Sequence, residues 1–160
     1  MKIKVTKVDY SNSQQANDLV SLLSVYAQDP MGGGKALDNY VVSHLIDELS
    51  NRPYAFSVLC YVDDIPAGLV NCFEAFSTFS CKPLVNIHDV IVIKEFRGHN
   101  LSQKMLAKVE EIAKSKGCCK LTLEVLSKNE AARSSYAKFG FSDYELDPKM
   151  GTAHFWQKLI

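Results

Sequence analysis

Residues 90–106 read VIVIKEFRGHNLSQKML, and this stretch decides the fold. Its first four residues are all apolar and β-branched, which predicts a strand that is buried on both faces. A polar turn follows, and from about Leu101 the apolar residues recur at the spacing of an α-helix. The expected helix buries a stripe made of Leu101, Met105, Leu106, Val109, Ile112 and Ala113.

The turn between this strand and this helix, residues 97–102, is a candidate anion site. A strand that enters a helix through a small turn containing Gly98 leaves backbone N–H groups pointing at one place, with the helix dipole behind them. Phosphate is the usual ligand of such a turn. By geometry alone an ordinary strand-to-helix connection would look the same, so the identity of the residues has to decide between these two interpretations.

The composition is that of a globular protein, and we expect one domain over residues 1–160. Lys plus Arg and Asp plus Glu both number 18, so the zero net charge gives no electrostatic reason to expect nucleic acid or an anionic membrane as a partner. No apolar run approaches the ~20 residues of a membrane span, and we expect no signal peptide. The cysteines form no C-x-x-C pair, so we expect reduced thiols, no metal site and a cytoplasmic location.

Periodicity outlines the other elements. It predicts strands over residues 1–8, 54–62, 65–76, 84–93 and 121–126, and helices over residues 14–26, 37–49 and 129–138. Asp63-Asp64 is a hairpin signal between two of the strands. Residues 144–146 and 154–160 are expected to form a last hairpin around Asp147-Pro148.

The turn carries a sequence pattern, Val92-x4-Arg97-Gly98-x-Asn100-Leu101-Ser102-x3-Leu106. This pattern resembles the acetyl-CoA-binding signature of the GNAT N-acetyltransferases, whose turn receives the CoA pyrophosphate. Asn100 stands where that family usually has glycine, and Ser102 stands where it has glycine or alanine. Asparagine is the non-glycine residue most tolerant of left-handed backbone, so we expect the loop to keep its shape.

A second block strengthens the resemblance. Leu123-Glu124-Val125 is followed by Asn129-x2-Ala132-x3-Tyr136-x2-Phe139-Gly140-Phe141, which resembles the second conserved block of GNAT enzymes in order and spacing. Together the blocks extend the resemblance over about residues 54–160. It implies the α+β acyl-CoA N-acyltransferase fold, a three-layer α/β/α sandwich with a mixed, mostly antiparallel central sheet.

The resemblance also implies roles for individual residues. The pantetheine arm of acetyl-CoA would pair with Val90, Ile91 and Val92, and the N–H of Val92 would stabilise the oxyanion. Asn129 would bond the cofactor arm, and Tyr136 would contact the cofactor and protonate the departing thiolate. The pyrophosphate would bind to the turn formed by Arg97, Gly98, His99, Asn100, Leu101 and Ser102.

Three interpretations of the general base stay open. His88 matches a base-like histidine of some GNAT enzymes, and Glu124 matches the base of others; the third interpretation is a water chain without a dedicated base. Histidine titrates near neutral pH without help, whereas a carboxylate has to be tuned upward. Strict strand alternation predicts that His88 shares a face with Val90 and Val92, and that Asp89 points the other way.

The resemblance implies transfer of acetyl from acetyl-CoA to a primary amine of a small molecule or peptide, by direct attack in a ternary complex. No cysteine occupies a position suited to a covalent acyl-enzyme. The alternative is a GNAT-like domain that binds CoA as a sensor or binding module but has lost catalysis. The first two helices and residues 73–82 would set the acceptor, and a homodimer stays open.

Overall fold

The computed structural model describes residues 1–160. Contacts within the chain divide it into two compact units, residues 1–123 and residues 124–160, and each is described by itself. The expectation of one domain over residues 1–160 stays a prediction. The first unit contains β1 (Ile3–Lys7), α1 (Ser13–Gln28), η1 (Pro30–Gly32), α2 (Asn39–Ser50), β2 (Ala55–Val62), β3 (Ile65–Ser77), β4 (Lys82–Val92), η2 (Lys94–Phe96), α3 (Leu101–Ser115) and β5 (Leu121–Leu123). The second contains α4 (Glu130–Phe139) and η3 (Pro148–Met150).

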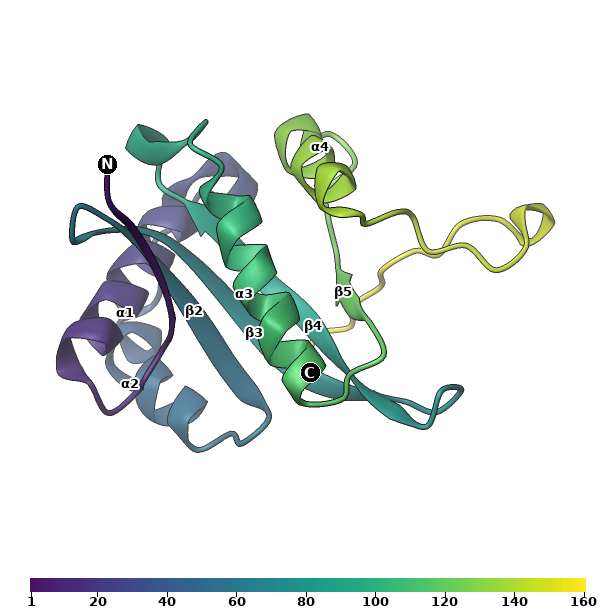
Figure 1. Cartoon of the computed structure of the whole chain (residues 1–160), viewed down its shortest axis with the longest axis horizontal. Coiled ribbons are helices and arrows are strands. Elements are labelled where there is room, and N and C mark those ends of the chain that lie inside the picture. Colours follow the sequence, from purple (N-terminus) through teal and green to yellow (C-terminus); the bar gives the residue numbers. More distant parts are fainter. The chain divides into compact units, whose positions relative to one another are not determined.

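The five strands form one sheet in the order β1-β2-β3-β4-β5 (Figure 1). The first four run antiparallel to their neighbours, and β5 runs parallel to β4. The sheet is therefore mixed and mostly antiparallel, as predicted. Asp63 and Asp64 join β2 to β3 with φ angles of 48° and 64°, the left-handed pair that a two-residue hairpin turn requires.

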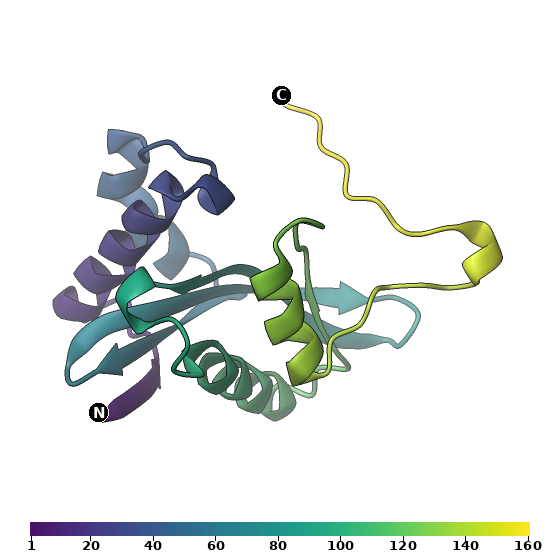
Figure 2. The same cartoon turned by 90° about the horizontal axis from the view of Figure 1, so that it is seen from above.

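Helices cover both faces of this sheet (Figure 2). α1 and α2 pack on one face, where a core cluster includes Leu19, Leu22, Leu59, Leu69 and Ile91. α3 packs on the other face through the stripe that its sequence predicts, of which only Ile112 is half-buried rather than buried. The first unit thus has the three layers expected. None of the helices is both long enough and apolar enough to cross a bilayer.

In the second unit, α4 begins and ends as its sequence predicts. Asn129 caps the helix by accepting a hydrogen bond from the Ala132 N–H at 3.2 Å, and Gly140 ends it with a φ of 109°. The predicted last hairpin is wrong, since residues 144–146 and 154–160 form no strand. Asp147 instead caps the short turn η3, and Pro148 has no N–H to give to a ladder.

Candidate acetyl-CoA and acceptor site

The turn between β4 and α3 has the backbone shape that an anion site needs. Gly98 has a φ of 84°, and Asn100, the N-cap residue of α3, has a φ of 61° and a ψ of 22°. Both lie in the left-handed region, so asparagine does here what glycine does in the related signature. The left-handed backbone expected at Asn100 is confirmed, and a loop that keeps the shape of the family's turn stays a prediction. The N–H groups in the first turn of α3 point toward this loop, and the positive end of the helix dipole lies there too.

Arg97 adds a cation to the same loop. Its Nε donates to the carbonyl oxygen of Val92 at 3.0 Å, and its Nη2 lies 3.2 Å from a carboxylate oxygen of Asp29. The hydrogen bond from the Met31 N–H holds the pKa of Asp29 below its ordinary value, and Arg97 lowers it further. The Arg97 side chain is 55% exposed, so a phosphate could reach it. The loop therefore combines a helix N-terminus with an accessible guanidinium, which suits a pyrophosphate.

The end of β4 presents backbone groups on its side away from β3. Ile93 donates to the Ala67 carbonyl of β3 at 3.1 Å, and Val92 is the next residue back along the ladder. In an antiparallel ladder such bonds alternate, so the backbone groups of Val90 and Val92 point away from β3. β5 pairs only with residues 85–87 of β4. The edge at Val90–Val92 thus lies beyond the pairing with β5, where an extended ligand could bond to the backbone.

A β-bulge in β4 changes the placement of His88. Asp89 pairs with Asn71 of β3. Ile87 pairs with Cys72, the next residue of β3, so His88 has no residue opposite it. An extra residue of this kind interrupts the alternation of side chains between the two faces.

The prediction that His88 shares a face with Val90 and Val92 is therefore wrong. The His88 ring lies edge-on to Phe73, with 5.6 Å between ring centroids, and Phe73 packs on the core cluster of the α1 face. Ile91 belongs to that same cluster, and Val90 precedes it on the opposite face. His88 itself is exposed.

Asp89, the polar residue beside His88, was not predicted as a site residue from the sequence. The Asp89 carboxylate is half-buried on the α1 face and accepts a hydrogen bond from Nδ2 of Asn71 at 2.9 Å. Burial raises the pKa of Tyr26, near the end of α1, and the charges of Asp89 and Asp29 raise it further. Two carboxylates thus lie near Tyr26. In the sequence, two adjacent polar residues inside an apolar strand, His88 and Asp89, are the feature that could have indicated the bulge.

The other predicted site residues lie in the second unit. Glu124 is exposed, and Asn129 and Tyr136 are half-buried. Because the Oδ1 of Asn129 accepts from the backbone of α4, the side-chain amide of Asn129 is fixed in orientation. The Tyr136 ring lies edge-on to Phe141, with 6.0 Å between centroids. The first unit contains the remaining predicted site residues, which are His88, Val90, Ile91, Val92, Arg97, Gly98, His99, Asn100, Leu101 and Ser102.

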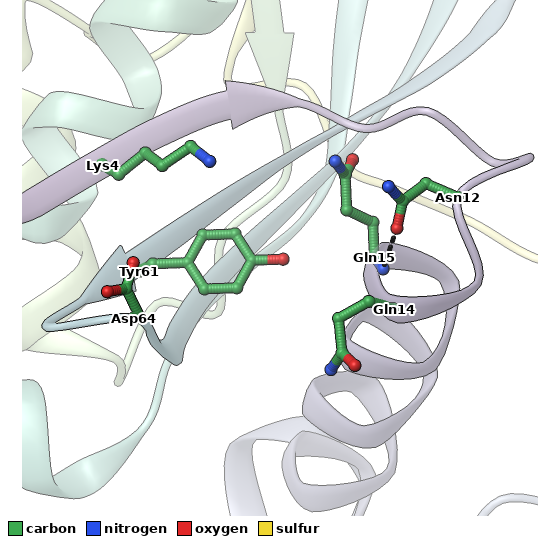
Figure 3. Close-up of a pocket in the computed structure, with 6 residues that line it drawn as sticks. All are labelled: Lys4, Asn12, Gln14, Gln15, Tyr61 and Asp64. Carbon is green, nitrogen blue, oxygen red and sulfur yellow. Dashed lines mark hydrogen bonds between the residues drawn. The ribbon is translucent and has the colours of Figure 1, made fainter.

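An open pocket of about 230 Å³ lies at the beginning of α1 (Figure 3). It is lined by Lys4, Asn12, Gln14, Gln15, Tyr61 and Asp64. Nearby, Tyr61 donates a hydrogen bond to the buried carboxylate of Asp18 at 2.8 Å, which fixes α1 on the sheet. Asp29, which contacts Arg97, follows the other end of this 16-residue helix, about 24 Å away along its axis. The pocket is therefore distinct from the loop that precedes α3.

The family model described as the acetyltransferase (GNAT) family matches residues 19–141. This match covers more than half of the chain and includes both sequence blocks, so the chain belongs to the GNAT family of acetyltransferases.

Among curated proteins, the thialysine N-epsilon-acetyltransferase of Bos taurus is 37% identical over 71 residues, which are 44% of this chain and 41% of that protein. The chain thus spans about two fifths of the length of the curated relatives it matches.

Solved structures confirm the fold. An aminoglycoside acetyltransferase from an uncultured soil metagenomic sample, in complex with trehalose, has a TM-score of 0.77 at 17% identity, with 99% of this chain and 97% of that chain covered. AAC(6')-Iy in complex with a bisubstrate analog, CoA-S-monomethyl-acetylneamine, has a TM-score of 0.78 at 14% identity, with both chains fully covered. At these identities the likeness establishes the acyl-CoA N-acyltransferase fold and no substrate.

Proposed function

We propose that the chain transfers an acetyl group from acetyl-CoA to a primary amine of a small molecule, by direct attack in a ternary complex. The observation that carries this proposal is the loop at residues 97–102, where Gly98 and Asn100 are left-handed and an exposed Arg97 precedes the start of α3. Family membership supports acetyl transfer. The thialysine and aminoglycoside acetyltransferases among its relatives support a small amine as the acceptor.

The cosubstrate would bind along two adjoining parts of the first unit. The loop formed by Arg97, Gly98, His99, Asn100, Leu101 and Ser102 would receive the pyrophosphate. The outward backbone groups of Val90 and Val92, with Ile91 between them, would pair with the pantetheine arm. A CoA-based bisubstrate analog bound to one structural relative supports CoA as the donor. Asn129, whose Oδ1 is committed to its own helix, would offer the cofactor arm its Nδ2.

The reaction requires that the oxyanion is stabilised, that the departing thiolate is protonated and that the amine loses a proton. The neutral amine attacks the thioester carbonyl carbon, and the Val92 N–H stabilises the oxyanion that forms. Collapse of that intermediate breaks the carbon–sulfur bond, and Tyr136 donates its hydroxyl proton to the departing thiolate. The amine loses one proton in exchange, to His88, to Glu124 or to a water chain. His88 stays a candidate base although it lies on the α1 face and not on the face predicted for it, since it is exposed next to Asp89.

The test is release of CoA thiol from acetyl-CoA over a panel of thialysine, lysine, polyamines, aminoglycosides and short peptides. We expect one small amine to be acetylated with thiol release equal to product formed, as checked by mass spectrometry. If acetyl-CoA binds but no amine is acetylated, the chain is a CoA-binding module and the proposal is wrong. With an active amine, His88→Ala and Glu124→Gln separate the bases, because only loss of the true base removes the acid limb of the kcat/KM profile.

A further inference from the structure

A chain of hydrogen bonds crosses three neighbouring strands on the α1 face of the sheet. The Tyr10 hydroxyl lies 2.9 Å from Oγ of Ser57 in β2. Ser57 Oγ donates to Oδ1 of Asn71 in β3 at 2.7 Å. Asn71 Nδ2 donates to Oδ2 of Asp89 in β4 at 2.9 Å. Ser57, Asn71 and Asp89 are direct partners in the strand register, so their side chains share one face.

Every hydrogen bond in this chain points toward Asp89. A serine hydroxyl has one proton, and Ser57 gives it to Asn71, so the Tyr10 hydroxyl has to donate to Ser57. Asn71 accepts through its oxygen and donates through its nitrogen, which fixes the orientation of its amide. A primary amide does not lose its proton readily, so the chain orients Asp89 rather than conducting protons to it.

This chain of hydrogen bonds occupies positions in the sheet that apolar residues could fill. Ser57 is completely buried and Asn71 is 4% exposed, between core residues such as Leu59 and Leu69. Burial of polar groups costs free energy unless each is hydrogen-bonded, and apolar groups of similar size carry no such cost. The only member that combines a charge with access to solvent is Asp89, which is half-buried at the bulge. We therefore expect this chain of hydrogen bonds to act through Asp89.

Asp89 directly precedes Val90–Val92, the backbone proposed to hold the pantetheine arm, so an amine that attacks the thioester there would approach from nearby. Asp89 shares the α1 face with Tyr26, which lies near the end of α1. A carboxylate that is partly withdrawn from water and held by a fixed donor binds an ammonium group more strongly than a solvated one does.

We propose that Asp89 binds the ammonium group of the acceptor, and that Tyr10, Ser57 and Asn71 are positioning residues that hold the Asp89 carboxylate in place. The inference rests on the proposed function, because it names the acceptor contact of the same reaction. Asn71 provides the last hydrogen bond, so it has the largest effect on Asp89 of the three.

The test is steady-state kinetics with the amine of the panel that wild type acetylates fastest. We expect Asn71→Leu to raise the acceptor KM about tenfold, as loss of one hydrogen bond to a charged group would, while the Kd for acetyl-CoA stays within about twofold. Tyr61→Phe is the matched control. It also removes a tyrosine hydroxyl hydrogen bond to a carboxylate, that of Asp18 in α1, and it should change neither constant.

A double-mutant cycle tests whether Asn71 acts through Asp89. Asp89→Asn should raise the acceptor KM more than Asn71→Leu does, and adding Asn71→Leu to it should cause little further change. Additive effects, an unchanged acceptor KM in Asn71→Leu, or a parallel loss of acetyl-CoA binding would each overturn the inference.

A second variant covers the case in which the first does not fold. If Asn71→Leu does not fold, Tyr10→Phe replaces it, with an expected rise of about twofold to threefold in the acceptor KM and no change for acetyl-CoA. An unchanged acceptor KM in a folded Tyr10→Phe would then overturn the inference. Failure of wild type to acetylate any amine would instead refute the proposed function itself.

Discussion

At the scale of single residues, the role proposed for Tyr136 depends on its hydroxyl, which one substitution removes. Its ring packs edge-on to Phe141, and a phenylalanine would keep that contact. If the hydroxyl protonates the CoA thiolate, Tyr136→Phe should lower kcat by about 10²–10⁴-fold, as expected for loss of a general acid, with little change in acetyl-CoA affinity. Tyr40→Phe, at an exposed tyrosine of α2, is the control and should leave kcat unchanged. Near-normal turnover in Tyr136→Phe would reduce Tyr136 to a packing residue.

The cysteines give a prediction about reactivity. Cys60 is completely buried, and burial raises the pKa of its thiol to about 11; burial also raises the pKa of Cys72, with a contribution from Asp89. Cys81 and Cys119 are exposed. Since the thiolate is the reactive form, a thiol reagent at neutral pH should label Cys81 and Cys119 in the folded protein, and Cys60 and Cys72 only after unfolding. Peptide mapping by mass spectrometry checks this, and rapid labelling of Cys60 would contradict it.

The Cys60 thiol makes the stability of the fold depend on pH in a defined direction. The folded state holds the Cys60 proton to a higher pH than the unfolded chain, whose thiol has an ordinary value of 9.0. Stability from burying the neutral thiol is therefore fully present below about pH 9, and it is lost as the pH rises toward about 11. Thermal unfolding across this range should show a falling midpoint, and Cys60→Ala should flatten that fall.

The sequence predicted some residue conformations and missed others. Asn100 could be predicted in left-handed backbone, because its short polar side chain tolerates that region and the signature needs it there. The partnership of Asn71 with Asp89 could not, since it depends on a register shift between β3 and β4. Periodicity specifies which residues alternate, but it does not specify where an extra residue enters a strand.

At the scale of elements, the packing of α3 on β3 depends on Gly68. A Cβ added there would lie 2.8 Å from Cε of Met105 and 2.9 Å from the carbonyl oxygen of Ile91. The methionine end can move, but the backbone oxygen cannot move without disturbing the ladder. Gly68→Ala should therefore lower the free energy of unfolding by about 1–3 kcal/mol, the usual cost of overpacking.

Chemical denaturation of Gly68→Ala gives the measurement. Ala75→Val is the control on the same strand, because Ala75 is exposed and the added carbons meet solvent. It should change stability by less than about 0.5 kcal/mol. Equal stability of wild type and Gly68→Ala would show that α3 does not approach β3 as closely as this structure has it.

Elements with strong internal signals were predicted well, whereas the strands expected from residue 121 onward were predicted poorly. α3 and α4 carry an apolar stripe or caps in their own sequence, and both occur as expected. The strand expected over residues 121–126 ends at Leu123, and residues 154–160 form no strand although they are rich in apolar side chains. A strand requires hydrogen bonds to a neighbour, and the composition of one segment does not reveal whether that neighbour is there.

At the scale of the whole molecule, the match to the GNAT family includes two sequence blocks that lie in different units. Residues 97–102 belong to the first unit and residues 129–141 to the second, and the GNAT family model matches across both. Structural relatives of 14% and 17% identity share the fold over nearly the whole chain. The arrangement of elements is therefore retained where little sequence identity remains, and the activity is argued from residues at the site rather than from the fold.

Thermal unfolding with acetyl-CoA tests most directly the central claim, that the loop at residues 97–102 binds the cosubstrate. At a hundredfold excess over its Kd, acetyl-CoA should raise the free energy of unfolding by about 2.7 kcal/mol. Gly98→Val should abolish this response, because a β-branched residue is strained at a φ of 84°. Gly117→Val, at the left-handed glycine after the other end of α3, should keep the response at similar cost to stability. No stabilisation of wild type by millimolar acetyl-CoA, or equal responses in the two variants, would contradict the claim.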